Sequence, residues 1–265
     1  KAKDFNKGMV NDPVQLIQGK VGGLTVVKPG GDPNGSYTLR LRGVSTFGAN
    51  ASPLIVIDGV IGGSLNTVDP NDIASIDVLK DGSAAAIYGS RGSAGVIIIT
   101  TKTGKSGKAT VEYNGSIAFE NVANSIEFMD AAEYRALPGA VDLGGTTDWL
   151  DEVTDTGVSQ IHNVSLSGGN NSTTYRASVN VRDVTGVGIN SGYDQMNTRL
   201  NLTQKALNDR MKINVNLSLT SKDSEFGFSE SFRYAIAGNP TLPVRQDVSA
   251  NGVTAGAVTG GYAER

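Results

Sequence analysis

The sequence contains no cysteine and a single histidine, His162, among its 265 residues. Without cysteine the chain has no thiol nucleophile, no disulfide and no cysteine-based metal site. One histidine is too few for a two-histidine zinc site. We therefore expect neither a metal nor a cofactor.

Charge and long apolar runs are also scarce. Only 18% of the residues are charged and the net charge is −3, so the basic footprint of a nucleic-acid-binding protein is missing. No apolar run reaches the roughly 18 residues that a membrane-spanning helix needs. A membrane β-barrel is compatible with both absences, because its short strands alternate apolar and polar residues.

Residues 1–108 have the pattern of a small α/β unit. Apolar, β-branched segments are bounded by Gly, Pro or Asp, which predicts strands. The predicted strands are 39–44, 54–60, 73–79 and 96–101. Asp12 and Pro13 introduce a short helix over 14–21, and 82–89 is a second helical turn that ends at Gly89. Glycine-rich loops connect these segments.

After residue 108 the period changes to two. In 109–122, Val111 and Tyr113 share one face of the predicted strand, whereas Glu112 and Asn114 share the other. The same alternation predicts four further strands, at 161–169, 173–183, 196–204 and 210–222. Such strands of about nine to eleven residues match a tilted transmembrane strand.

Alternation alone leaves three classes open. A soluble glycan-binding β-sandwich also alternates. A periplasmic hydrolase would need a nucleophile–base pair or paired carboxylates, which we cannot place, so we expect no enzyme. The connectors favour a barrel, because 205–209 is a tight turn whereas 123–159 is long.

The segment "DVLKDGSAAAIYGSRGSAGVIIITTKTG" (77–104), with "LRLRGV" (39–44) and "PLIVIDGV" (53–60), resembles the plug domain of TonB-dependent outer-membrane transporters. The variant is similar to the SusC/RagA family of the Bacteroidetes. The segment 164–187 resembles early barrel strands of that family, and "NPTLPV" (239–244) resembles an extracellular loop.

This resemblance implies the N-terminal part of an antiparallel transmembrane β-barrel of about 22 strands, with an α/β plug domain in its lumen. Residues 1–108 would be the plug, and 109–265 the first barrel strands with long extracellular loops. Five strands cannot close a barrel, so we expect the chain to be part of a larger transporter.

The resemblance also implies a function. It is TonB-dependent active import of oligosaccharides or oligopeptides across the bacterial outer membrane. The implied partners are a SusD-like surface lipoprotein, outer-membrane lipid, and TonB acting through an N-terminal box that we do not find in residues 1–12.

Two groups of site residues follow from the resemblance. Arg42 and Arg91 of the plug would form a plug–barrel latch with wall carboxylates such as Glu112 or Glu120, or with acids beyond this chain. Outward plug loops would face the substrate through small polar and aromatic side chains: Asp32, Asn34, Phe47, Asn50, Ser64 and Asn66. The alternative is that these are ordinary turn residues.

Three further features of residues 109–265 lead to predictions. A helix is predicted over 128–137, with Asp130 as N-cap and Glu133 at capping-box spacing. His162 is expected in the wall or at an interface. Trp149 either docks a partner or packs its own loop.

Overall fold

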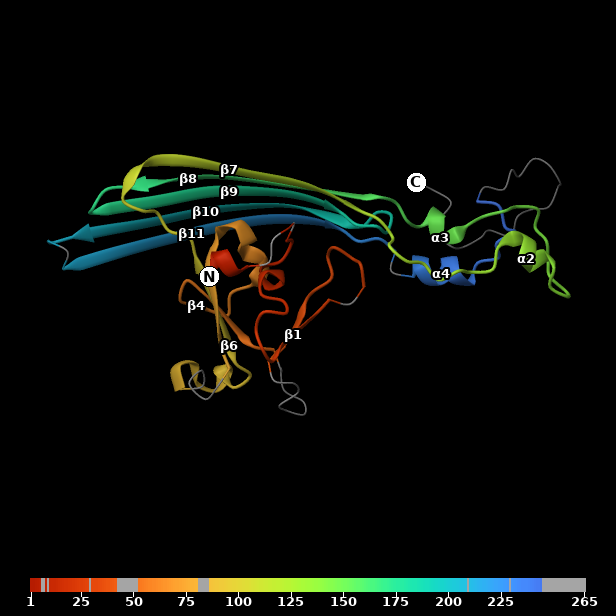
Figure 1. The fold of residues 1–265 in the computed structure, drawn as a ribbon, viewed down its shortest axis with the longest axis horizontal. Coiled ribbons are helices and arrows are strands. Elements are labelled where there is room, and N and C mark those ends of the chain that lie inside the picture. The colour runs from red at the N-terminus through yellow and green to blue at the C-terminus, as the bar shows by residue number, and fades with distance from the viewer. Residues whose placement is uncertain are drawn as a thin grey trace.

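The computed structural model describes residues 1–5, 8, 10–28, 30–41, 52–80, 86–208, 210–228 and 230–244. The long strands β7 (Gly107–Glu120) to β11 (Met211–Glu225) form one five-stranded sheet. Figure 1 shows two layers: this sheet, and a small α/β body on one of its faces. Loops with short helices extend the molecule beyond one end of the sheet (Figure 1).

The small body, residues 1–106, contains two sheets. One pairs β1 with β2, and the other has the order β4-β3-β6-β5, with β3 parallel to β6. The strands are β1 (Leu24–Val27), β2 (Thr38–Leu41), β3 (Leu54–Ile57), β4 (Val60–Ile61), β5 (Ile73–Leu79) and β6 (Val96–Thr101). The 3-10 helices are η1 (Ala2–Asp4), η2 (Pro13–Leu16), η3 (Leu65–Thr67), η4 (Pro70–Asp72) and η5 (Gly89–Gly92).

A compact apolar core holds the small body together. Ile97 and Ile99 are each 1% exposed, on the central strand β6. Around them lie Val14, Leu16, Ile17, Leu39, Ile57, Val68 and Ile73. A strand covered on both faces explains the continuous apolar run of β6.

Most predicted elements of this part are confirmed. Strands 73–79 and 96–101 are found at their predicted bounds, whereas 54–60 divides into β3 and β4 at Asp58. The helix expected over 14–21 is shorter: the capping box of Asp12 and Gln15 starts η2, which ends at Leu16. Residues 86–88 are helical and Gly89 has φ +65°, as its role as a stop requires. The rest of 82–89, and 42–44, lie outside the described residues.

The large sheet is antiparallel and its strands pair in chain order, β7 to β11. The strands are β7 (Gly107–Glu120), β8 (Gly157–Gly169), β9 (Thr173–Thr185), β10 (Gly192–Ala206) and β11 (Met211–Glu225). The five predicted strands are confirmed. At 13 to 15 residues β8 to β11 are longer than expected, whereas β7 has the expected 14 residues but begins two residues earlier than predicted. The boundary expected at residue 108 stays a prediction.

The two faces of this sheet differ in chemistry. Large apolar side chains on one face are exposed, including Val111, Ile117, Leu217 and Leu219. The opposite face is polar and carries the small α/β body. No second sheet covers the apolar face within the part of the chain that the structure describes, which favours the barrel over the β-sandwich alternative.

The strand connections are short at one end, the turn end (170–172 and 207–210), and longer at the other, the loop end (121–156, 186–191 and beyond 225). The loop end carries α2 (Ala131–Arg135), α3 (Trp149–Glu152) and α4 (Ser231–Ala237). Asp130 caps α2 through a capping box with Glu133, as predicted. Trp149 packs its loop: its Nε1 donates to the Asn239 carbonyl over 2.9 Å.

None of the described helices is long and apolar enough to cross a membrane. His162 is a wall residue, as one of the two expectations had it: its Nδ1 lies 2.8 Å from the Tyr113 hydroxyl on the neighbouring strand β7.

Candidate functional site: the contact between the α/β body and the sheet

The polar face of the sheet is buried against the α/β body. Because side chains alternate along each strand, Ser, Asn and Arg gather on one side. The register aligns them in rows; one row contains Ser165, Ser178, Arg199 and Ser218. The buried polar residues of this face are Ser159, Asn163, Ser165, Arg176, Ser178, Asn180, Arg182, Asn197, Arg199 and Asn201.

Arg182 and Asp69 form the most deeply buried ion pair. The Arg182 side chain is 1% exposed and that of Asp69 is fully buried. Arg182 Nη2 and Nε lie 2.6 Å and 2.8 Å from Asp69 Oδ2. Arg182 Nη1 donates to the carbonyls of Val10 and Asn11. One arginine of β9 therefore holds both η4 and the segment before η2.

Asp72 collects three donors from β9. Its carboxylate accepts from Ser178 Oγ at 2.7 Å, Asn180 Nδ2 at 2.8 Å and Arg176 Nη2 at 3.3 Å. Asp69 and Asp72 both belong to the short η4 segment, and Asp69 also caps η4 through Asn71 N. This one turn thus supplies two of the three acids that reach the sheet.

A third pair joins Asp58 to Arg199 of β10, with Nη1 and Oδ2 3.1 Å apart. Asp58 lies in the β3–β4 turn at φ 49°, and its carboxylate also accepts from the Thr101 N–H and hydroxyl. Nearby, Asn201 Nδ2 donates to the Lys102 carbonyl over 2.7 Å. The three ion pairs together span β9 and β10.

The ion pairs that the structure describes between the α/β body and the sheet have the opposite polarity to the predicted latch. We expected arginines in the plug and acids in the wall, but in the described residues the ion pairs join wall arginines to plug aspartates. Arg91 is exposed and its guanidinium lies close to Gly62. No ion pair joins it to Glu112 or Glu120 in the described part of the chain, and Arg42 lies outside that part.

The acids were missed because each of them lies in a turn. Asp58 precedes Gly59, Asp69 precedes Pro70, and Asp72 ends the short turn that Pro70 begins, all settings where Asp is common for conformational reasons. The arginines were visible in the sequence, since Arg176, Arg182 and Arg199 all fall on the polar faces of predicted strands. An arginine repeated on a buried polar face requires a carboxylate partner, and that signal could have found the interface.

The outward loops are partly brought together. Asn34 Nδ2 donates to the carbonyls of Gly192 and Glu225, at the loop ends of β10 and β11. The Asn66 carbonyl accepts from Gln195 Nε2. Asn34, Ser64 and Asn66 line one cavity of about 290 Å³, whereas Asp32 is exposed beside it. Phe47 and Asn50 lie outside the described residues.

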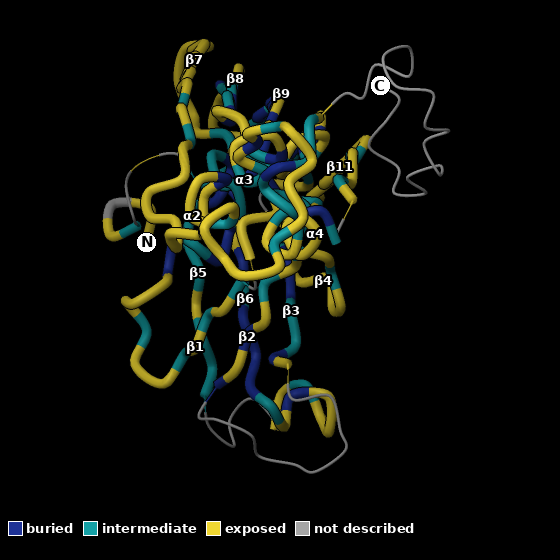
Figure 2. Tube along the Cα trace, turned by 90° about the vertical axis from the view of Figure 1, so that its right-hand side faces the viewer, coloured by how far each residue is buried: buried dark blue, intermediate teal, exposed yellow. Residues whose placement is uncertain are grey.

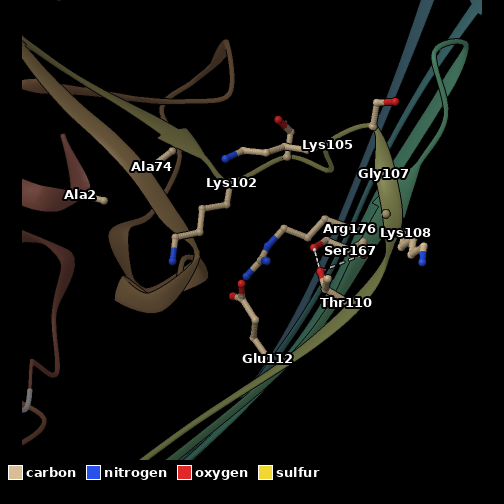
Figure 3. A pocket seen from close by; sticks show the side chains of 13 residues that line it. Ala2, Ala74, Lys102, Lys105, Gly107, Lys108, Thr110, Glu112, Ser167 and Arg176 are labelled. Atoms are coloured by element: carbon tan, nitrogen blue, oxygen red, sulfur yellow. Dashed lines mark hydrogen bonds between the residues drawn. The ribbon is translucent and has the colours of Figure 1, made fainter.

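A second cavity, of about 560 Å³, lies at the turn end between the α/β body and β7. Figure 3 shows Lys102, Lys105 and Lys108 around it, with the side chains of Arg176 and Glu112 pointing toward one another. Thr110 Oγ1 lies 3.2 Å from Ser167 Oγ across β7 and β8. Glu112, one of the expected latch acids, is therefore on the inward face, as predicted for the wall.

The comparisons with known proteins agree with this architecture. Residues 1–96 match the family model described as "TonB-dependent Receptor Plug Domain". The chain is 36% identical over 263 residues to the TonB-dependent receptor SusC of Bacteroides thetaiotaomicron, covering 92% of this chain and 26% of that protein. It is 39% identical over 209 residues to TonB-dependent receptor P3 of Formosa agariphila, covering 77% of this chain and 21% of P3.

Several solved structures are also similar to this chain. The RagAB peptide importer in its closed-closed state matches with a TM-score of 0.75 and 25% identity, over 86% of this chain and 30% of that chain. The siderophore receptor PirA of Acinetobacter baumannii has the same fold, with a TM-score of 0.53. The chain spans about a quarter of the length of the curated relatives it matches.

The α/β body is thus the plug of a TonB-dependent outer-membrane receptor, and the long-stranded sheet is the first part of its barrel. Within that class the chain belongs to the SusC/RagA type of transporter. Such receptors are located in the outer membrane, which agrees with the exposed apolar face of β7–β11.

Proposed function

We propose that this chain is the plug and first wall segment of a TonB-dependent active importer. The observation that carries the proposal is the charged, buried contact between plug and wall. An interface of Arg–Asp pairs holds a plug only while the geometry of the pairs is intact. Displacing the plug exposes both partners to water, where each ion is solvated again.

Removing one partner of a buried pair typically costs about 3–5 kcal/mol, whereas a matched apolar contact would often be as stable as the pair or more so. Such an interface therefore holds the plug while all its ion pairs are formed. It releases the plug when a force breaks the pairs together. TonB, using the proton-motive force of the inner membrane, would supply the pull through an N-terminal box.

Arg42 and Arg91 remain part of this proposal as further latch residues, paired with acids elsewhere in the whole transporter. The change Arg91→Ala is then expected to loosen the plug and to raise the conductance of the full-length transporter in planar bilayers. Conductance equal to that of the unchanged transporter would count against a latch at Arg91.

Exposed apolar side chains at the loop end favour a binding site for a partner protein at the cell surface. Several large apolar side chains there are exposed: Phe226, Phe228, Phe232, Tyr234 and Ile236. Figure 2 shows the region of α2 and α4 as largely exposed. Thr241 is fully buried and ties the post-β11 loop to the first long loop, since Thr241 O accepts from Gly145 N. We propose that a SusD-like lipoprotein docks on this platform.

The cargo we propose is an oligosaccharide or an oligopeptide, bound where the plug loops meet the wall. Asn34, Ser64 and Asn66 converge on one cavity there, which favours a polar cargo. The RagAB structures similar to this chain are described as a peptide importer, which favours peptides, although the chain is more similar in sequence to SusC, at 36% identity, than to the RagAB chain, at 25%.

The test is uptake by cells that express the full-length transporter. We expect growth on oligosaccharides or on oligopeptides to require the transporter gene, the neighbouring lipoprotein gene and tonB, and to stop with a protonophore. A strain that lacks the transporter but carries an unrelated TonB-dependent receptor is the control. Growth that is independent of tonB would overturn the proposal.

A further inference from the structure

The cavity of about 290 Å³ lies at the loop end, between the plug and the inner face of the wall. The plug side is anchored there by Asn34, whose amide nitrogen is bound to the ends of β10 and β11. The charged and aromatic lining is Asp12, Lys28, Tyr37, Asp69, Arg182, Tyr193 and Lys222. Plug and wall thus share one chemically specific pocket.

Two lysines of this pocket form no ion pair among the described residues, although Asp12 and Asp32 are close enough to act on the charge of each. Lys28 Nζ lies 5.4 Å from the centre of the Tyr37 ring and donates one hydrogen bond, to the Pro33 carbonyl. Lys222 Nζ lies 4.0 Å from the centre of the Tyr193 ring. Neither ammonium is within ion-pair distance of a carboxylate in the described residues. Burial lowers the pKa of Lys28, a direction that an anion placed beside it would reverse.

Two hydrogen-bond acceptors of the same lining lack donors. The Oδ1 atoms of Asn11 and Asn34 are buried and accept no hydrogen bond. A buried amide oxygen without a donor is costly and in native proteins is usually satisfied by a ligand or by water. The pocket therefore combines cationic donors with neutral acceptors, which matches a ligand that carries an anion next to hydroxyl or N–H groups.

Neither acid of the pocket lining, Asp12 or Asp69, serves as a counter-ion for Lys28 or Lys222. Asp69 is bound to Arg182. Asp12 accepts from the Val14 N–H at the start of η2, and burial raises its pKa, so its own charged form is disfavoured. Among the lining residues, Lys28, Lys222 and Arg182 outnumber Asp12 and Asp69. Asp32, which is near Lys28, is exposed and holds the Asn34 N–H.

We propose that this pocket binds a carboxylate of the cargo between Lys28 and Lys222, with adjacent hydroxyl or N–H groups donating to Asn11 and Asn34. The inference rests on the proposed import function and narrows its cargo to acidic molecules. A uronate of an oligosaccharide and the C-terminus of a peptide carry the same chemistry, and charge-assisted hydrogen bonds would select either over a neutral analogue.

The experiment is calorimetric titration of the purified full-length transporter with two matched pairs of probes. One pair is trigalacturonate and neutral galactotriose, and the other is trialanine and trialanine amide. We expect at least one carboxylate probe to bind at least tenfold more tightly than its neutral counterpart, with an affinity that falls as salt is added. The pair that shows the preference identifies the source of the carboxylate.

Variants locate the effect in the pocket. Lys28→Met and Lys222→Met are each expected to abolish the preference for the carboxylate, and Asp12→Asn to increase it, because that change removes a negative charge and keeps a capping side chain. Lys212→Met is the matched control, a lysine on the inward face of the same strand β11 but outside the lining, and should leave the preference unchanged.

Two results would overturn the inference: equal binding of both members in both pairs, or a preference that persists in both Lys28→Met and Lys222→Met. The uptake experiment separates this failure from that of the proposed function. If growth depends on tonB but carboxylates are not preferred, only the acidic cargo is wrong. If growth does not depend on tonB, the import function itself is wrong.

Discussion

Arg182 is a long charged side chain that is almost completely removed from water, yet its counter-ion and the two carbonyls that it binds come from the plug. Asp69 neutralises it, and two plug carbonyls accept from its Nη1. The guanidinium suits this position because it remains charged and offers donors in several fixed directions. At the scale of single residues, the plug is held by arginines that are satisfied only while the plug is in place.

Replacing one member of this pair should therefore be more harmful than replacing both. We expect Arg182→Met to destabilise the seated plug by about 3–5 kcal/mol, because Asp69 is left buried without a counter-charge. The double variant with Asp69→Asn should recover part of that loss. The measurement is the urea concentration at which the plug of the full-length transporter becomes accessible to trypsin.

Arg135→Met is the control for this cycle, because Arg135 pairs with Asp142 on the loop surface, where an ion pair contributes at most about 1 kcal/mol. If Arg182→Met shifted the urea midpoint no more than Arg135→Met does, the wall arginines would not hold the plug.

Among the elements, the strands of the wall are specified by their alternation. One residue of register shift would turn Arg176, Arg182 and Arg199 toward the apolar side and the apolar residues toward the plug. The short turns support the same register: Leu207 and Asn208 both have φ 52°, the left-handed conformation of tight hairpin turns. Strand lengths were underestimated, because the ends of β10 and β11 carry polar residues that break the apolar period.

The loop helix α2 depends on its capping residue. Asp130 Oδ1 accepts from the N–H groups of Ala132 and Glu133, each over 2.8 Å. Asp130→Ala should destabilise α2 by about 1 kcal/mol. We expect amide hydrogen exchange in 131–136 to become roughly fivefold faster, since about 1 kcal/mol corresponds to that factor. Asp130→Asn preserves an acceptor and should exchange like the unchanged protein; equally fast exchange in both variants would contradict the role of the cap.

Over the whole molecule, three ion pairs from two adjacent strands, β9 and β10, connect the plug to the wall. They reach Asp58 of the β3–β4 turn and two acids of η4, so both turns would have to leave the wall together. Because the 265 residues contain no cysteine, an engineered cross-link across this contact has no competing thiol in the chain.

A covalent bond across the contact should block import. Ser178 Oγ and Asp72 Oδ2 are 2.7 Å apart, so cysteines at the two positions would lie close to disulfide reach. In the full-length transporter, we expect oxidised Asp72→Cys/Ser178→Cys to bind its lipoprotein but to lose uptake, and a reductant to restore uptake. The single cysteine variants are the controls. Uptake by the fully cross-linked protein would mean that the plug does not need to leave this part of the wall.

The sequence alone determined the elements, the two-part organisation and the faces of the wall strands. These properties are local: hydrophobic period and turn chemistry report directly on whether a side chain points toward lipid or toward a polar interior. The N-cap at Asp12 and the capping box at Asp130 are local in the same sense, and both were predicted from the sequence.

Only the tertiary structure decided which charges meet. Asp58, Asp69 and Asp72 lie 104 to 141 residues from their arginines in the chain, and each occupies a turn in which aspartate is ordinary. The same holds for the pocket of Lys28 and Lys222, which come from the plug and from the last wall strand described. Contacts between distant residues follow from how the plug is seated on the wall, and no short-range pattern encodes that arrangement.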